Sequence, residues 1–298
     1  MKRALTTLAS IAALLICIEA AAQNTVTKKY DYKGFNSIEV SSFFNVTVEK
    51  SRNYSIEAIV SEEYEDYLEI RLKGNELSIG FRSLPAKLLV SSFSGIASVK
   101  VSMPELSRVE LSGSSKLSCN DNFDLGRGVF NLSVSGTSRL EALSISASEG
   151  RIYASGASKA RIDGDFIDLL INSSGTARIE GDLSSEDFEI KTSGTSVLDL
   201  EGQFEDLEIN ASGVSNVTLL GLAESIEINA SGTSSVDASK LAVKEAEVKL
   251  SAASVAKVNA SRILEVSASG TSRCSYKDND NLQVIEKGIS RTSFLRAE

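Results

Sequence analysis

Five glutamates recur at nearly constant spacing in the second half of the chain: Glu189, Glu208, Glu227, Glu247 and Glu265. Carboxylate oxygens are ligands that calcium prefers in proteins. We therefore consider weak calcium binding by Glu208, Glu227 and Glu247, with Glu189 and Glu265 on either side. The alternative is a solvated face, on which these side chains spread apart or pair with Lys191 and Lys249, two residues further along. No other cofactor is expected.

Four basic residues recur with similar spacing earlier in the chain: Lys116, Arg139, Lys159 and Arg178. Two residues after the last three, Glu141, Arg161 and Glu180 alternate in sign. This alternation is typical of surface ion pairs between neighbouring repeats, each contributing ~0–1 kcal/mol to stability. The second hypothesis is that the four basic residues form a strip that binds an acidic polysaccharide.

The rest of the composition offers little for catalysis. The 298 residues include no histidine and no tryptophan, which removes the usual general base near neutral pH and the commonest metal ligand. Carboxylate pairs could serve a polysaccharide hydrolase or lyase, but among 40 Asp and Glu residues chance pairs carry little information. We therefore predict a protein that is not an enzyme, with a carbohydrate-active β-helix enzyme as the alternative. The net charge of −9 and the lack of a long basic run argue against nucleic-acid binding.

The recurring acidic and basic residues belong to a sequence repeat, which determines where they lie in the fold. The phrase Ser-Gly-x-Ser, or a close variant, occurs nine times, and its glycine position is filled by Gly113, Gly136, Gly156, Gly175, Gly194, Gly213, Gly232, Ala252 and Gly270. Around each copy apolar and polar residues alternate with a period of two, which is typical of strands with one buried face. A repeat of about 19 residues predicts an all-β fold, a right-handed parallel β-helix in which each repeat is one coil.

In such a stack, equivalent residues of successive coils lie in columns. One inward column should consist of Ile152, Ile171, Ile190, Ile209, Ile228, Val248 and Val266. Cys119 and Cys274 should be free thiols, because their coils lie at opposite ends of the stack and a disulfide needs Cα atoms within ~7 Å. Ala252 suggests that a positive φ is not obligatory at the glycine position.

The chain divides into four parts. Residues 1–22 are similar to a secretory signal peptide, with Lys2 and Arg3 before an apolar run that is shorter than the ~20 residues of a membrane span. Residues 23–105 form an aromatic-rich β region, residues 106–275 the regular coils, and residues 276–298 a C-terminal cap. The two flanking parts are expected to cover the ends of the stack, because an open end exposes a sheet edge. No later segment is apolar enough to cross a membrane.

The segments Phe35-Asn-Ser-Ile-Glu-Val-Ser, Phe44-Asn-Val-Thr-Val and Leu77-Ser-Ile, followed by serial Ser-Gly-x-Ser phrases, resemble a family of exported bacterial proteins common in the Bacteroidetes. It is the "putative auto-transporter adhesin, head GIN domain" family. The resemblance implies a β-helical fold and a place in the cell envelope, and it brings no catalytic residues.

The sequence therefore predicts a non-enzymatic, adhesin-like protein exported to the periplasm or the outer surface. Its expected partner is a glycan, or a protein of the envelope or of a host surface. A third possibility, besides this function and the carbohydrate-active enzyme, is a structural envelope component that associates with itself.

Overall fold

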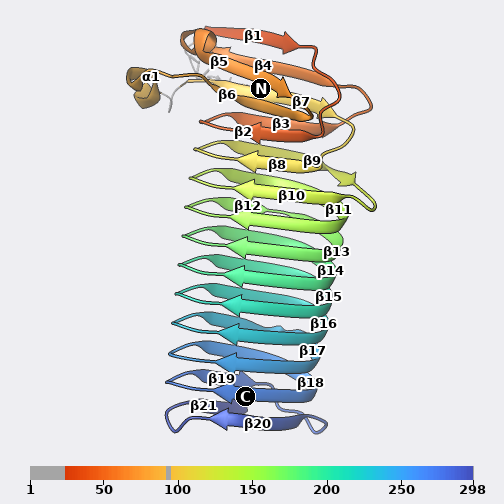
Figure 1. Cartoon of the computed structure of the whole chain (residues 1–298), viewed down its shortest axis with the longest axis vertical. Helices are drawn as coiled ribbons and strands as arrows, with labels where there is room; N and C mark the ends of the chain where they lie inside the picture. The colour runs from red at the N-terminus through yellow and green to blue at the C-terminus, as the bar shows by residue number, and fades with distance from the viewer. Residues whose placement is uncertain (1–23, 92–94, 298) are drawn as a thin grey trace, which may run out of the picture.

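The fold is a long β-solenoid (Figure 1). The structure is a computed structural model that describes residues 24–91 and 95–297; the predicted signal peptide, residues 1–22, lies outside the described residues. Strands make up 68% of the structure, and the chain winds through about 10 turns with coils of about 19 residues. The predicted all-β parallel β-helix is confirmed.

The N-terminal part adds antiparallel strands to the parallel stack. β1 (Thr25–Tyr30) pairs with β4 (Ser55–Ser61), β4 with β7 (Ala97–Met103), and β5 (Leu68–Lys73) with β6 (Glu76–Phe81), all antiparallel. β6 and β7 then lie parallel to β2 (Ser37–Val40) and β3 (Asn45–Lys50). The 3-10 helix η1 (Glu62–Tyr67) and α1 (Ala86–Ser91) complete this part. Buried Tyr64 packs against Phe81, whose ring also lies 4.4 Å from that of Phe44, so aromatic side chains close this end of the core.

From β8 onward, successive coils stack in parallel. The strands are β8 (Arg108–Leu111), β9 (Lys116–Asp124), β10 (Val129–Val134), β11 (Arg139–Ala154), β12 (Lys159–Arg161), β13 (Asp163–Ser173), β14 (Arg178–Thr192), β15 (Val197–Ala211), β16 (Asn216–Ala230), β17 (Ser235–Leu250), β18 (Val255–Ala268), β19 (Arg273–Tyr276), β20 (Gln283–Ile289) and β21 (Phe294–Ala297). Each of β14 to β18 is a single strand of 14 to 16 residues. It bends around the core and ends at a Ser-Gly-x-Ser turn. β15 and β16 pair from Val197–Asn216 to Ala211–Ala230 without a register shift.

The turns require a positive φ at every glycine position of the repeat. Gly194 has φ +72°, and a Cβ built there would lie 2.5 Å from the carbonyl oxygen of Gly175 in the turn above. Ala252 adopts φ +58° as well, so the prediction that a positive φ is not obligatory is wrong. The reason is that the stack fixes the turn: the N–H of Ala253 donates to the carbonyl of Gly232 at 2.9 Å, as its equivalents do in the other coils.

The aliphatic column predicted from the repeat lies inside the solenoid. Ile152 is aligned with Ile171, Ile171 with Ile190, and so on to Val248 and Val266. All seven side chains are fully buried, which confirms the predicted register. Cys119 and Cys274 are free and buried, as predicted.

The C-terminal end of the stack is built differently. β20 and β21 continue the coil, pairing with β18 and β19 respectively, and no further strand follows within residues 24–91 and 95–297. Glu286 is aligned with buried Val266 at the end of the aliphatic column, and its side chain is exposed. A register shift follows this pair, and charged side chains on a sheet edge disfavour pairing with another sheet.

Candidate functional site

The five recurring glutamates lie in one outward column, the glutamate column. Glu189, Glu208, Glu227, Glu247 and Glu265 are aligned one above the other on five successive coils. Each directly precedes a residue of the aliphatic column, so its side chain points to the opposite side of the wall. Parallel stacking places these like charges ~4.8 Å apart, which is unfavourable unless other groups compensate for them.

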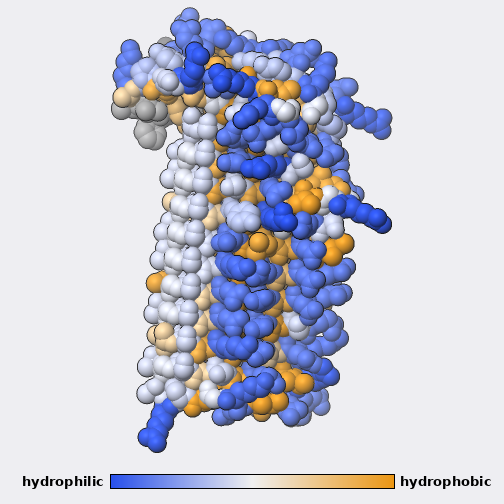
Figure 2. All heavy atoms as spheres, in the orientation of Figure 1, coloured by the Kyte–Doolittle hydropathy of each residue, from blue (hydrophilic) through white to orange (hydrophobic). Residues whose placement is uncertain are grey.

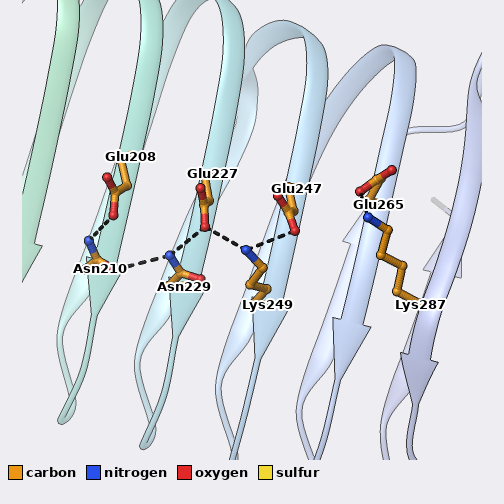
Figure 3. Close-up of polar contacts among 8 residues, drawn as sticks. All are labelled: Glu208, Asn210, Glu227, Asn229, Glu247, Lys249, Glu265 and Lys287. Atoms are coloured by element: carbon orange, nitrogen blue, oxygen red, sulfur yellow. Dashed lines mark hydrogen bonds and ion pairs between the residues drawn. The ribbon is translucent and has the colours of Figure 1, made fainter.

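Every carboxylate of the glutamate column has a donor, and Figure 3 shows those of Glu208, Glu227, Glu247 and Glu265. Lys191 pairs with Glu189 at 2.6 Å, and the amide of Asn210 donates to Glu208 at 2.7 Å. Lys249 bridges two coils, with its Nζ 2.8 Å from Glu227 and 3.0 Å from Glu247. Asn229 also donates to Glu227, and Lys287 pairs with Glu265. The column is therefore a network of carboxylates, amides and ammonium groups.

The network shifts the pKa values of its central groups. Hydrogen bonds from Lys249 and then Asn229 lower the pKa of Glu227 below its usual value of 4.5. Hydrogen bonds to Glu227 and Glu247 raise the pKa of Lys249. Lys249 and Glu227 are thus charged near neutral pH.

A second acidic column, which the sequence analysis missed, runs beside the first. It lies two residues earlier in each coil and consists of Glu149, Asp168, Asp187, Asp206 and Glu245, with Ser225 between the last two. A groove of about 850 Å³ lies between the two columns. Its lining includes the core residues Leu169, Phe188, Leu207, Ile226 and Ala246, each only 2–3% exposed. Figure 2 shows a hydrophobic strip between hydrophilic columns along this side of the solenoid. The 19-residue recurrence of Asp168, Asp187 and Asp206 would have predicted this column.

The glutamate column does not form a compact metal site. In the described part of the chain, no group of three or more Asp, Glu, Cys or His side chains is arranged to hold a metal ion. Calcium would have to displace the ammonium of Lys249 from Glu227 and Glu247 before binding between them. Weak calcium binding by Glu208, Glu227 and Glu247 stays a prediction.

The four recurring basic residues also lie in one column, the cationic column, directly after the Ser-Gly-x-Ser turns. Lys116 is aligned with Arg139, Arg139 with Lys159, and Lys159 with Arg178. Lys116, Arg139 and Lys159 are exposed, and Arg178 is half-buried. The next position of the column is Val197, so the positive charges end at Arg178.

Among the described residues, Arg178 is the one member of the cationic column that forms ion pairs. Arg178 pairs with Glu180 and, at 2.6 Å, with Asp199. Within residues 24–91 and 95–297, neither Lys116, Arg139 nor Lys159 has a carboxylate within the 4.0 Å of an ion pair, and the same holds for neighbouring Arg161. Glu141, the expected partner, lies at a β-bulge between β9 and β11, outside the paired register.

A second groove begins at the lower end of the cationic column. It has a volume of about 1120 Å³, and Arg161, Arg178, Gly181, Gly202 and Gly221 are among its lining residues. Its carboxylates include Asp163, Asp182 and Glu201, which again recur once per coil. A hydrolase would need an acid and a base that converge on one bond, whereas these carboxylates follow the repeat.

The sequence matches one family model. Residues 34–182 and 168–279 match the family described as "Putative auto-transporter adhesin, head GIN domain". No curated protein matches the chain. The described residues contain no helix that is long and apolar enough to cross a membrane.

Several solved structures are similar to the chain over nearly its whole length. A "putative adhesin" from Parabacteroides merdae is 19% identical, with 93% of this chain and 97% of that chain covered and a TM-score of 0.48. A "putative adhesin" from Parabacteroides distasonis is 17% identical, with coverage of 92% and 98% and a TM-score of 0.47. A "putative lipid binding protein" from the same species is 14% identical, with coverage of 93% and 98% and a TM-score of 0.42. These similarities are too remote to transfer a function.

Proposed function

Because this chain belongs to the auto-transporter adhesin, head GIN domain family, we propose that it is an exported, non-enzymatic, adhesin-like protein of the cell envelope. Its ligand is a glycan on a cell surface, bound along a long side of the solenoid. The family assignment supports a surface partner, and the N-terminal segment resembling a signal peptide supports export.

The observation that carries this proposal is the continuity of the outward columns. The groove beside the glutamate column extends from Glu149 to Glu265 with an apolar strip between polar groups (Figure 2). Ligand sites commonly combine an apolar surface with a few fixed polar groups. Here those groups repeat at ~4.8 Å, so an extended polymer can contact several coils at once.

The chemistry of the groove favours binding over hydrolysis. A glycosidase needs a carboxylic acid whose pKa is raised, so that it can protonate the leaving group. Glu227 has a lowered pKa because Lys249 and Asn229 donate to it. Together with the absence of histidine from the sequence, this supports a non-enzymatic role.

A glycan array probed with residues 23–298 tests the proposal. We expect binding to at least one polysaccharide without release of reducing ends, and binding to intact cells that display it. Absence of binding to every glycan and to cell surfaces would contradict the proposal, and product release would favour the enzyme. Fractionation of cells that produce the full chain should place it in the periplasm or on the surface.

A further inference from the structure

The two charged columns of this solenoid differ in how their charges are balanced. Each carboxylate of the glutamate column has a hydrogen-bond or ion-pair donor, whereas Lys116, Arg139 and Lys159 have no carboxylate at ion-pair distance among the described residues. We propose that the cationic column, together with Arg161, is a binding site for an anionic polysaccharide. This inference rests on the proposed function and deepens it by adding a second site, apart from the groove beside the glutamate column, and the ligand class that this site takes.

The stacking of the cations is the first argument. Adjacent coils hold Lys116, Arg139 and Lys159 in register, so neighbouring charges originate ~4.8 Å apart. Like charges at this distance destabilise the stack, and in a chain with net charge −9 carboxylates were available to balance them. An anionic ligand supplies the missing counter-charges. The guanidinium of Arg139 can bind a carboxylate or sulfate through two parallel hydrogen bonds.

Hydroxyl groups beside the column are the second argument. The exposed side chains of Ser114, Thr137 and Thr176 stand two residues before Lys116, Arg139 and Arg178, at the tips of the turns. Thr137 and Thr176 each donate to a glycine carbonyl of the preceding turn, at 3.1 Å in both cases. Their oxygens retain acceptor capacity and can take hydrogen bonds from sugar hydroxyls, next to cations that bind the acidic groups.

The length of the cationic column limits the length of ligand that it can contact. Its upper neighbour is Asn45, which is aligned with Lys116, and its lower neighbour is Val197. The charges thus span three coil steps, about 14 Å along the axis. Nucleic acids are poorer ligands, because their dense phosphates need longer basic tracts. The site accordingly binds a short stretch of an acidic polysaccharide.

Titration of residues 23–298 with defined polymers tests this inference. Polygalacturonate presents carboxylates, heparin presents sulfates and carboxylates, and neutral dextran presents neither. We expect binding to one or both anionic polymers, weakened by added salt, and none to dextran. The variant Lys116→Gln/Arg139→Gln/Lys159→Gln should bind roughly tenfold more weakly or worse, because three charge contacts are lost.

Two matched variants make the result specific to the column. Arg127→Gln/Lys240→Gln/Lys277→Gln removes the same charge from dispersed exposed positions and should leave affinity within about twofold. Lys116→Arg/Arg139→Lys/Lys159→Arg keeps the charges and should retain binding. Far-ultraviolet circular dichroism and melting curves verify that each variant folds.

The inference would be overturned if the column variant and the dispersed variant lost the same affinity, or if the column variant bound as tightly as wild type. Tighter binding of single-stranded DNA than of either polysaccharide would overturn it too. A glycan array positive only for neutral glycans would also overturn it while leaving the proposed function intact. A column that binds polygalacturonate in a protein that binds no cell surface would instead support the site and contradict the proposed function.

Discussion

The aliphatic column and the glutamate column occupy adjacent positions of the same strands, yet stacking has opposite consequences for them. Ile209 lies between Ile190 and Ile228 inside the wall, and Glu208 lies between Glu189 and Glu227 outside it. Inside, each identical neighbour adds apolar contact and excludes water. Outside, each identical neighbour adds repulsion, which Lys249 and the asparagines offset. Stacking identical side chains therefore stabilises the inner side of the wall by itself. On the outer side, stacked charges also need neighbouring groups that offset their repulsion.

The largest effect is expected from a charge placed in the aliphatic column. Ile209 is fully buried, so Ile209→Asp buries a carboxylate without a partner and should lower the free energy of unfolding by several kcal/mol. Ile209→Val is the control, with an expected loss of about 0.5–1.5 kcal/mol. Urea denaturation followed by circular dichroism measures both; similar stability of Ile209→Asp and wild type would refute the register.

Substitutions in the turns should have an intermediate effect, because the turns hold both columns in register. Gly194→Ala forces a Cβ toward the Gly175 carbonyl at a positive φ and should cost about 1–2 kcal/mol. The converse change, Ala252→Gly, removes a Cβ from the same backbone conformation and should stabilise the fold. Opposite shifts in melting temperature are expected, and a gain in stability for Gly194→Ala would contradict the strain argument.

A smaller effect is expected from Lys249→Met, which leaves Glu227 and Glu247 facing each other. Because the folded-state pKa of Glu227 is lowered, its contribution to stability is present above the unfolded value near 4.5 and is lost as the pH falls through the folded value. The variant should melt slightly lower at neutral pH and lose less stability on acidification below pH 4.5. Melting curves from neutral to acidic pH measure this, with Lys277→Met, at an exposed position without an ion pair among the described residues, as the control.

The smallest effect is expected from calcium. If calcium binds the glutamate column, millimolar concentrations should raise the melting temperature of wild type slightly, because binding favours the folded state. The rise should be larger in Lys249→Met, where the ammonium no longer competes, and absent from Glu208→Gln/Glu227→Gln/Glu247→Gln. A melting temperature of Lys249→Met that is indifferent to calcium would identify the column as a solvated face.

The sequence predicted what depends on the repeat alone. The coil length, the inward column and the alignment of both charged columns follow from the spacing of Ile209, Glu208 and their equivalents. The backbone conformation at the glycine position of the repeat was mispredicted, because Ala252 takes the positive φ that the neighbouring coils impose. Ser42 does the same at φ +67° in the first turn, where its carbonyl accepts the N–H of Ser114, and nothing in the local sequence marks it.

Details of side-chain pairing depend on small departures from the repeat. The sequence placed Glu141 beside the cations, but the bulge between β9 and β11 removes it from register. The bridge from Lys249 to Glu227 and Glu247 likewise depends on rotamers that spacing does not specify. The second acidic column was predictable from its spacing, whereas the groove depends on both columns lying on one wall of the solenoid.

The continuous pairing of β15 with β16 has a mechanical consequence. A force along the solenoid axis pulls adjacent coils apart and loads the hydrogen bonds between them directly, so the rod can separate one coil at a time. A force along the strands loads the whole ladder in shear, and many bonds must break together. A surface protein that is attached at one end and binds its ligand across several coils would resist drag better when the ligand pulls sideways, and the direction of load would then set how long the attachment lasts.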